Sequence, residues 1–138
     1  MISRPLGELA ESMGIRLVEA SAERTVATMP VIGNRQPLGL LHGGASALIA
    51  ETVGSVAASL GAGEGRFAVG IELNISHHRS ATDGVVTATA TAVQVGKTLA
   101  VYTVEIVDDQ GRRVSTGRLT CLYRDQQQRP AVVGTPPL

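Results

Sequence analysis

Residues 36–58, QPLGLLHGGASALIAETVGSVAA, contain the strongest helix signal in the chain and decide its fold. After a loop with Gly and Pro, residues 43–60 place apolar side chains at helical spacing, at Ile49, Val53, Val56 and Leu60. The face around Glu51 is mostly small instead of charged, with Gly44, Ala47, Leu48, Ser55 and Ala58. A merely solvated face would carry several charges, so we expect another backbone to come close here.

The segments on either side of this helix are typical of strands joined by tight turns. Alternation and the abundance of Thr and Val predict strands at 15–20, 23–31, 66–78, 84–95, 98–108 and 112–124. A short helix is expected at 5–13, and Ser21 with Ala22 forms the first tight connection. The order predicts an α+β domain over residues 1–125, with one long helix buried against a curled antiparallel sheet. Residues 126–138, rich in proline, are expected to form a disordered tail.

Composition excludes several classes of function. The 12 basic and 12 acidic residues cancel and aromatic residues make up 2%, so the basic stripe and stacking rings of a nucleic-acid-binding protein are missing. No signal peptide is visible and no stretch approaches the ~20 apolar residues of a membrane span, so we expect a cytoplasmic protein without a membrane partner. The single cysteine excludes an intrachain disulfide. His77 and His78 should point to opposite faces of a strand, so no metal site is expected.

Two features of the long helix are candidates for a catalytic site. The first amides of a helix lack intrahelical partners, and at Gly43 no side chain would keep a carbonyl oxygen away from the free N–H. Glu51 is the one acid of the predicted helix, and a carboxylate in such surroundings needs a role or a partner. The alternatives are that HGG is only a tight turn and that Glu51 faces solvent.

The run 36–58 resembles the signature of hotdog-fold thioesterases, and the likeness continues through GIELNISHHRS (70–80), QVGKTLAVYTVEI (94–106) and GRRVSTGRLT (111–120). It is strongest to the PaaI-type group, in particular its 1,4-dihydroxy-2-naphthoyl-CoA hydrolases and enterobactin proofreading thioesterases. The 4-hydroxybenzoyl-CoA thioesterases of Arthrobacter type are further relatives. The resemblance implies a hotdog fold, with five to six strands around the central helix, and hydrolysis of an acyl-CoA thioester.

The resemblance also implies roles for individual residues. Glu51 would be the nucleophile or general base, and the Gly43 amide would polarise the carbonyl. Gln36 would orient the carbonyl or water, and His42 would lie near the leaving sulfur. Ser55, one turn after Glu51, would bind the carboxylate or the water, with simple packing as the alternative. The acyl-CoA channel would be lined by Gly70, His77, His78, Arg79, Ser80, Gln94, Val95, Gly96, Lys97, Thr98 and Leu99, unless these are ordinary surface turns.

The resemblance further implies a homotetramer, a dimer of dimers, with Gly43 and Glu51 of one site coming from different subunits. No cofactor is expected, because coenzyme A is part of the substrate and product. An aromatic acyl group, such as dihydroxynaphthoyl or hydroxybenzoyl, is the first expectation. A phenylacetyl-CoA, medium-chain acyl-CoA or acyl-carrier-protein thioesterase remains the alternative. A hotdog dehydratase or a non-catalytic acyl-CoA-binding module fits less well, since neither needs Glu51 beside Gln36 and Gly43.

Overall fold

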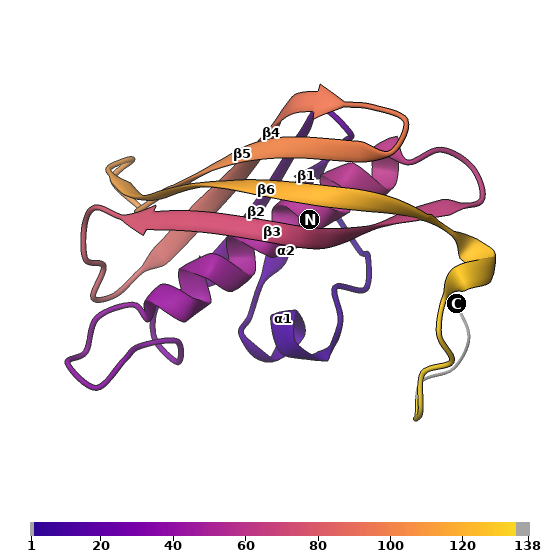
Figure 1. Cartoon of the computed structure of the whole chain (residues 1–138). Helices are drawn as coiled ribbons and strands as arrows, with labels where there is room; N and C mark the ends of the chain where they lie inside the picture. The colour runs from indigo at the N-terminus through magenta and orange to yellow at the C-terminus, as the bar shows by residue number, and fades with distance from the viewer. Residues whose placement is uncertain (1, 135–138) are drawn as a thin grey trace.

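The computed structural model describes residues 2–134 and contains one sheet curled around one long helix (Figure 1). The elements in chain order are α1 (Glu8–Ser12), β1 (Arg16–Ala20), β2 (Arg24–Pro30), α2 (Gly43–Gly61), β3 (Arg66–His77), β4 (Val85–Val95), β5 (Leu99–Val107), β6 (Arg113–Asp125) and the 3₁₀ helix η1 (Gln126–Gln128). All strand pairs are antiparallel, in the order β1-β2-β4-β5-β6-β3. The expected α+β architecture is confirmed.

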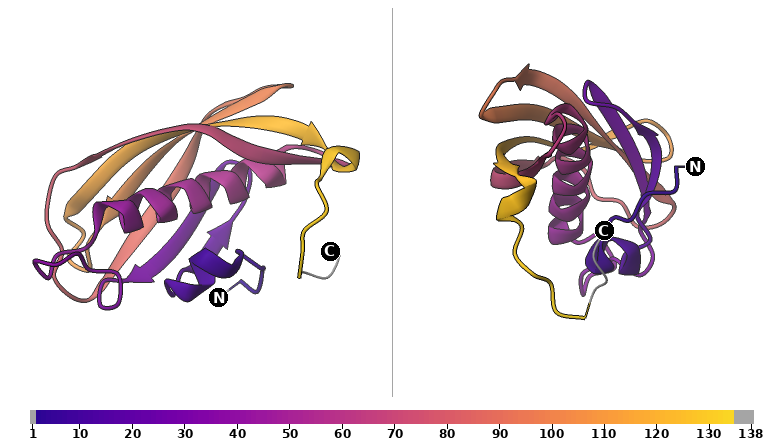
Figure 2. Two further views of the ribbon diagram at one scale, coloured as in Figure 1. Left: turned by 60° about the horizontal axis from the view of Figure 1, so that its bottom comes forward. Right: turned by 90° about the vertical axis from the view of Figure 1, so that its right-hand side faces the viewer.

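Helix α2 lies in the concave face of the sheet, and the core forms between them (Figure 2). Ile49 and Val53 are fully buried, as the apolar stripe predicts. Leu60 is 42% exposed, so its assignment to the buried stripe was wrong. In this last turn the helix meets the sheet through small residues, with Gly61 against Ala22 and Val95, and Ala57 and Ala58 fully buried.

By length and apolar composition alone, α2 would also qualify as a candidate membrane span. The expectation that no stretch comes near this limit was therefore too strict. Half of the helix is buried inside the fold, which is usual for the core helix of a protein domain and makes the test weak evidence for a membrane segment.

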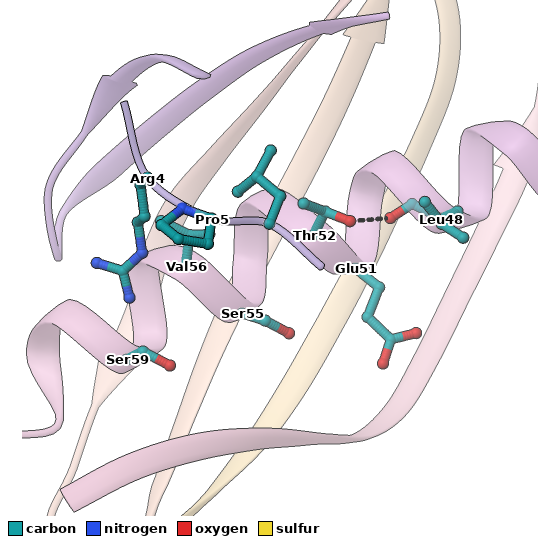
Figure 3. A pocket seen from close by; sticks show the side chains of 9 residues that line it. Arg4, Pro5, Leu48, Glu51, Thr52, Ser55, Val56 and Ser59 are labelled. Carbon is teal, nitrogen blue, oxygen red and sulfur yellow. Dashed lines mark hydrogen bonds between the residues drawn. The ribbon is translucent and has the colours of Figure 1, made fainter. Parts of the chain in front are cut away.

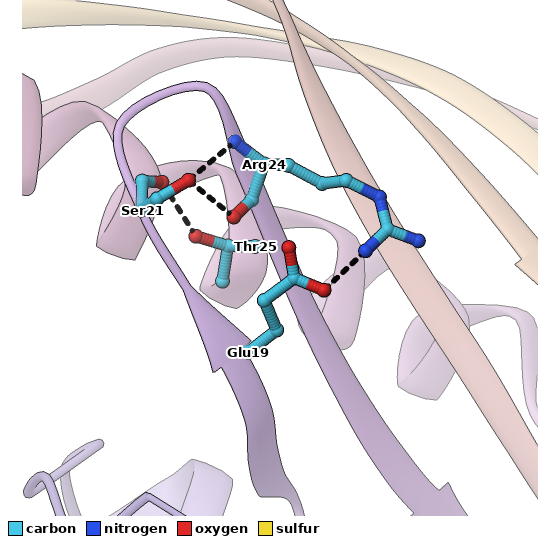
Figure 4. A network of polar contacts seen from close by, with 4 residues as sticks. All are labelled: Glu19, Ser21, Arg24 and Thr25. Atoms are coloured by element: carbon cyan, nitrogen blue, oxygen red, sulfur yellow. Dashed lines mark hydrogen bonds and ion pairs between the residues drawn. The ribbon is translucent and has the colours of Figure 1, made fainter.

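The connection between β1 and β2 is the tight turn expected at Ser21 and Ala22. The Ser21 hydroxyl donates to the Arg24 carbonyl, and its oxygen accepts from the Arg24 amide at 3.0 Å. The Thr25 hydroxyl donates back to the Ser21 carbonyl, and Arg24 pairs with Glu19 on the neighbouring strand (Figure 4). These contacts stabilise the β1–β2 hairpin. In the strand order of the sheet, β1 forms one edge and β3 forms the other.

Strand β3 carries a bulge that matters for the site. Gly70 pairs with Cys121 and Glu72 with Thr120, so Ile71 is an extra residue on β3. Side chains alternate along a strand, so Gly70 and His77, an odd number of positions apart, would otherwise lie on opposite faces of the sheet. The bulge brings both to the face that holds α2.

Two terminal expectations need correction. The first helix covers only Glu8–Ser12 instead of 5–13, because Gly7 has a φ of 92°, outside the helical region, and the chain enters the helix there. At the other end η1 forms inside the segment expected to be disordered, stabilised by a capping box between Asp125 and Gln128. Residues 135–138 of that segment lie outside the described residues.

Candidate active site

The N-terminus of α2 presents a free amide, as the sequence predicts. His42 is the N-cap, and its Nδ1 accepts a hydrogen bond from the Gly44 amide at 2.8 Å. Within residues 2–134 the Gly43 amide makes no hydrogen bond. The positive end of the helix dipole is concentrated on such free N–H groups, so the amide is suited to a developing oxyanion.

A cavity of about 280 Å³ opens beside this amide. Its lining includes six residues predicted from the sequence, Gln36, Gly43, His77, His78, Arg79 and Ser80, together with Leu40, Leu41, Ser46 and Val114. The Gln36 side-chain oxygen accepts from the Leu38 and Leu40 amides, which fixes the side chain in the loop. Its NH₂ group has no partner in the described part of the chain and can donate to a carbonyl or water.

Glu51 lines a second cavity, of about 360 Å³, which shares no lining residue with the first (Figure 3). Its carboxylate points toward β3. A Cβ on Gly70 would stand 2.8 Å from the Glu51 Oε1, so only glycine leaves room for the carboxylate at this place. Ser55, one turn further, lines the same cavity and lies on the same helix face. Ser55, expected on the face of Glu51, and Gly70, expected in the acyl-CoA channel, therefore both lie beside the carboxylate. Within one chain the Glu51 side chain is exposed, so it faces solvent there, as the alternative held.

Cys121 is fully buried on β6, where it pairs with Gly70. Burial raises the pKa of its thiol to about 11, a hydrogen bond with Ser55 works against this rise, and the charge of Glu51 adds to it. A thiol with such a pKa stays protonated near neutral pH and is a poor nucleophile. Cys121 is therefore a buried packing residue and not a candidate nucleophile.

One chain does not bring the whole predicted set together. Gly43 and Glu51 are eight residues apart on α2, which at 1.5 Å per residue is about 12 Å along the helix axis. They line different cavities. Gln94–Leu99 lie further away, at the β4–β5 turn near the C-terminal end of α2, where Val95 contacts Gly61. His42 caps the helix and is not among the residues that line the Gly43 cavity.

Some residues of the two cavities had no clear signal in the sequence. Arg4 and Pro5 lie across α2 and line the Glu51 cavity with Ser59 (Figure 3). Ser115 is fully buried and holds His77 through a hydrogen bond. A small polar residue in a Thr- and Ser-rich strand is inconspicuous, and nothing in the sequence of the N-terminal segment predicts its position. Among residues 2–134 no group of three or more His, Cys, Asp or Glu side chains could hold a metal ion.

Comparison with known proteins identifies the family. Residues 38–115 match the model of the thioesterase superfamily. The proofreading thioesterase EntH of Cronobacter turicensis is 41% identical over 83% of this chain and 85% of its own length. The 1,4-dihydroxy-2-naphthoyl-CoA hydrolase of Escherichia coli is 39% identical over the same shares of the two chains. The crystal structure of a Haemophilus influenzae thioesterase superposes with a TM-score of 0.83 at 35% identity, covering 87% of this chain and 85% of the other. The chain is thus an enzyme of the thioesterase superfamily, with the hotdog fold that the resemblance implied.

Proposed function

We propose that the protein hydrolyses the coenzyme A thioester of an aromatic acid, of the dihydroxynaphthoyl or hydroxybenzoyl type, to the free acid and coenzyme A. The observation that carries the proposal is the helix α2, which presents a free Gly43 amide in one cavity and the Glu51 carboxylate in another. These are the electrophilic and the nucleophilic halves of an acyl-transfer site. Relatives with thioesterase and hydrolase names at about 40% identity support the same reaction class.

The two halves would meet between two copies of the chain. β3 is an edge strand with an unpaired side and an exposed Ile71, so a second β3 can pair with it. Antiparallel pairing about the midpoint between Leu73 and Asn74 sets Gly70 of each copy opposite His77 of the other. Gly70 adjoins Glu51 and His77 adjoins Gly43. This register therefore brings Glu51 of one copy to the Gly43 cavity of the other.

The full assembly proposed is a homotetramer, a dimer of such dimers. The copy that supplies Glu51 also brings its own 94–99 turn, which lies beyond Glu51 toward the end of its helix. Coenzyme A is long enough to extend from a thioester at Gly43 toward such a turn. His78, Arg79, Ser80 and Lys97 supply suitable donors for its phosphates.

The reaction then follows from the positions of the donors and the acid. The Gly43 amide and the Gln36 NH₂ group polarise the thioester carbonyl. Glu51 either attacks the carbonyl carbon, giving an anhydride that water opens, or removes a proton from water that attacks directly. The C–S bond breaks, the sulfur leaves as thiolate and takes a proton from solvent, and the acid is released. Ser55 binds the carboxylate or the water. The reaction as proposed requires only water and these groups.

The Glu51 cavity supports a polar aromatic acyl group. Its walls combine apolar contacts from Pro5, Leu48 and Val56 with polar groups at Arg4 and Ser59. Ser59 lies two turns beyond Glu51 on the same face, so an aromatic ring could lie between them with a hydroxyl group near Arg4 (Figure 3). A phenylacetyl, medium-chain or acyl-carrier-protein thioester is the alternative, and a non-catalytic acyl-CoA-binding module is less well supported.

Thiol release from a panel of acyl-CoAs tests the proposal. Wild type, Glu51→Gln and the control Glu64→Gln, in the exposed loop after α2, are compared on benzoyl, hydroxybenzoyl, dihydroxynaphthoyl, phenylacetyl, hexanoyl and palmitoyl thioesters. We expect hydroxyaroyl thioesters to turn over fastest and Glu51→Gln to lose about a hundredfold in kcat, or ~3 kcal/mol of barrier. Faster hydrolysis of hexanoyl-CoA would favour the alternative substrates. No release from any thioester would contradict the reaction.

A further inference from the structure

His77 lies directly against the helix N-terminus. Its Nε2 is 2.7 Å from the position that a Cβ on Gly43 would occupy, and its Cδ2 is 3.2 Å away. The φ angle of Gly43 is not in the left-handed region, so the backbone there does not require glycine. The imidazole occupies the space that a Cβ at position 43 would need, so any other residue there would displace the ring. Gly43 therefore serves the site twice, by exposing its own amide and by admitting the edge of the His77 ring.

Ser115 determines which ring nitrogen of His77 carries the proton. The His77 Nδ1 is 2.9 Å from the Ser115 Oγ, and Ser115 is fully buried. In the described part of the chain the Ser115 hydroxyl has no other hydrogen-bond partner. If Nδ1–H donated to Ser115, the hydroxyl proton would be buried without an acceptor, which costs about 1–3 kcal/mol. The hydroxyl therefore donates to Nδ1, and the proton of the neutral ring is on Nε2.

The Nε2–H group and the Gly43 amide can share one acceptor. A Cβ stands about 2.5 Å from its own backbone nitrogen, so Nε2 is at most about 5 Å from the Gly43 nitrogen. Two donors at that separation can each reach a single oxygen at ~2.9 Å. Both face the same cavity. The other histidine at this end, His42, uses its Nδ1 to accept from Gly44 and so acts as a helix cap.

We propose that His77 is a catalytic residue, a second hydrogen-bond donor to the thioester oxygen beside the Gly43 amide, and that Ser115 is the positioning residue that sets its tautomer. The role rests on the proposed thioester hydrolysis. When the carbonyl carbon is attacked, the negative charge on its oxygen is shared by two donors, and the Nε2 proton stays on the ring. This places His77 at the reacting carbonyl, in addition to the contact with the coenzyme A channel that the resemblance implies.

The first test separates the carbonyl from the nucleotide. His77→Ala and wild type are compared on the same acyl group as the coenzyme A thioester and as the N-acetylcysteamine thioester, which lacks the nucleotide. We expect kcat/KM to fall about a hundredfold on both substrates, the loss typical of one oxyanion donor. His77→Gln, which keeps an N–H donor, should recover part of the activity. A loss confined to the coenzyme A thioester, seen in KM with kcat unchanged, would overturn the proposal. No release by wild type would instead refute the underlying hydrolase function, and this role with it.

A matched pair on β6 tests the positioning role. Ser115 binds His77, and its neighbour Thr116 binds His78 through an equivalent hydroxyl contact at 2.7 Å. Ser115→Ala should lower kcat about tenfold or more with KM little changed, whereas Thr116→Val should leave kcat at the wild-type value. Nitrogen-15 NMR of the histidine rings should show His77 as the Nε2–H tautomer in wild type and as a mixture in Ser115→Ala. A wild-type Nδ1–H tautomer, or equal kcat in the two variants, would contradict the assignment.

Discussion

Gly70 is a residue whose importance lies in the space that it leaves. Its φ angle is not in the left-handed region, so an alanine would fit the backbone. The added Cβ would instead stand 2.8 Å from the Glu51 Oε1 and 3.3 Å from the Leu119 Cδ1. The nearer atom is the end of a flexible side chain, which can rotate away at small cost. Gly70 thus controls where the carboxylate lies more than how stable the fold is.

Gly70→Ala should therefore separate activity from stability. We expect kcat to fall at least tenfold, because a carboxylate displaced by about 1 Å loses its alignment with the carbonyl, while the thermal unfolding midpoint changes by only a few degrees. In the Glu51→Gln background Gly70→Ala should lower kcat little further, because the side chain that it displaces is already inactive. An equal additional loss in both backgrounds would mean that Gly70 acts independently of Glu51.

At this scale the sequence predicts the residues with an evident chemical signature and misses those that support them. Gly43 and Glu51 stand out, one as a glycine opening a helix and the other as a lone acid on a small-residue face. Ser115 looks like any strand hydroxyl, because its role depends on the pairing that sets it opposite His77. Arg4 reaches the Glu51 cavity only through the tertiary path of the N-terminal segment, which no local pattern encodes.

Among the elements, the closest fit is between α2 and β6. A Cβ on Gly54 would stand 2.4 Å from the Leu119 Cδ2 and 3.3 Å from its Cβ, and both residues are buried. Real Cβ atoms do not approach so closely, so the helix can lie this near the sheet only with glycine at position 54. The usual cost of a glycine inside a helix, ~1 kcal/mol relative to alanine, is offset by this close packing.

Gly54→Ala should consequently destabilise the protein despite the better helix propensity. We expect the free energy of unfolding to fall by about 1–3 kcal/mol, as for overpacked cores, measured by urea denaturation. In a Leu119→Ala background the 2.4 Å clash with Cδ2 is gone and only the 3.3 Å approach to the Cβ remains, so the same substitution should be nearly neutral or stabilising by up to ~1 kcal/mol. Additive effects across this double-mutant cycle would show that the contact with Leu119 does not limit the packing.

Element bounds were largely predictable, whereas their arrangement was not. Alternation and turn residues locate all six strands to within about two residues, because they reflect local burial and backbone preference. The position of β3 beside β6, far from its neighbours in sequence, arises from packing around α2. The bulge at Ile71 also has no local signature, yet it turns Gly70 and His77 to the same face. The shorter α1 reflects the φ angle of Gly7, and exposed Leu60 reflects the small residues at the end of α2.

At the scale of the whole molecule, the separation of Gly43 and Glu51 is the central fact. A rigid helix holds them about 12 Å apart along its axis, in separate cavities, so no side-chain rotation within one chain can bring them to the same carbonyl. The proposed two-fold pairing of β3 strands would solve this by symmetry, since each copy would then supply the half that the other lacks. Activity should accordingly depend on chain association.

Mixing two inactive variants tests this dependence directly. Glu51→Gln retains a normal Gly43 half, and Gly43→Ala retains Glu51 while its new Cβ displaces the His77 ring. Each homo-oligomer should be nearly inactive. After joint unfolding and refolding, about half of the dimers pair one variant with the other, and each such dimer has one intact and one doubly altered site. We therefore expect roughly a quarter of the wild-type activity per chain. Recovery should require refolding, because simple mixing leaves the dimers unexchanged. If Gly43 and Glu51 of one chain formed the site, no combination of these variants could regain activity, whatever the assembly.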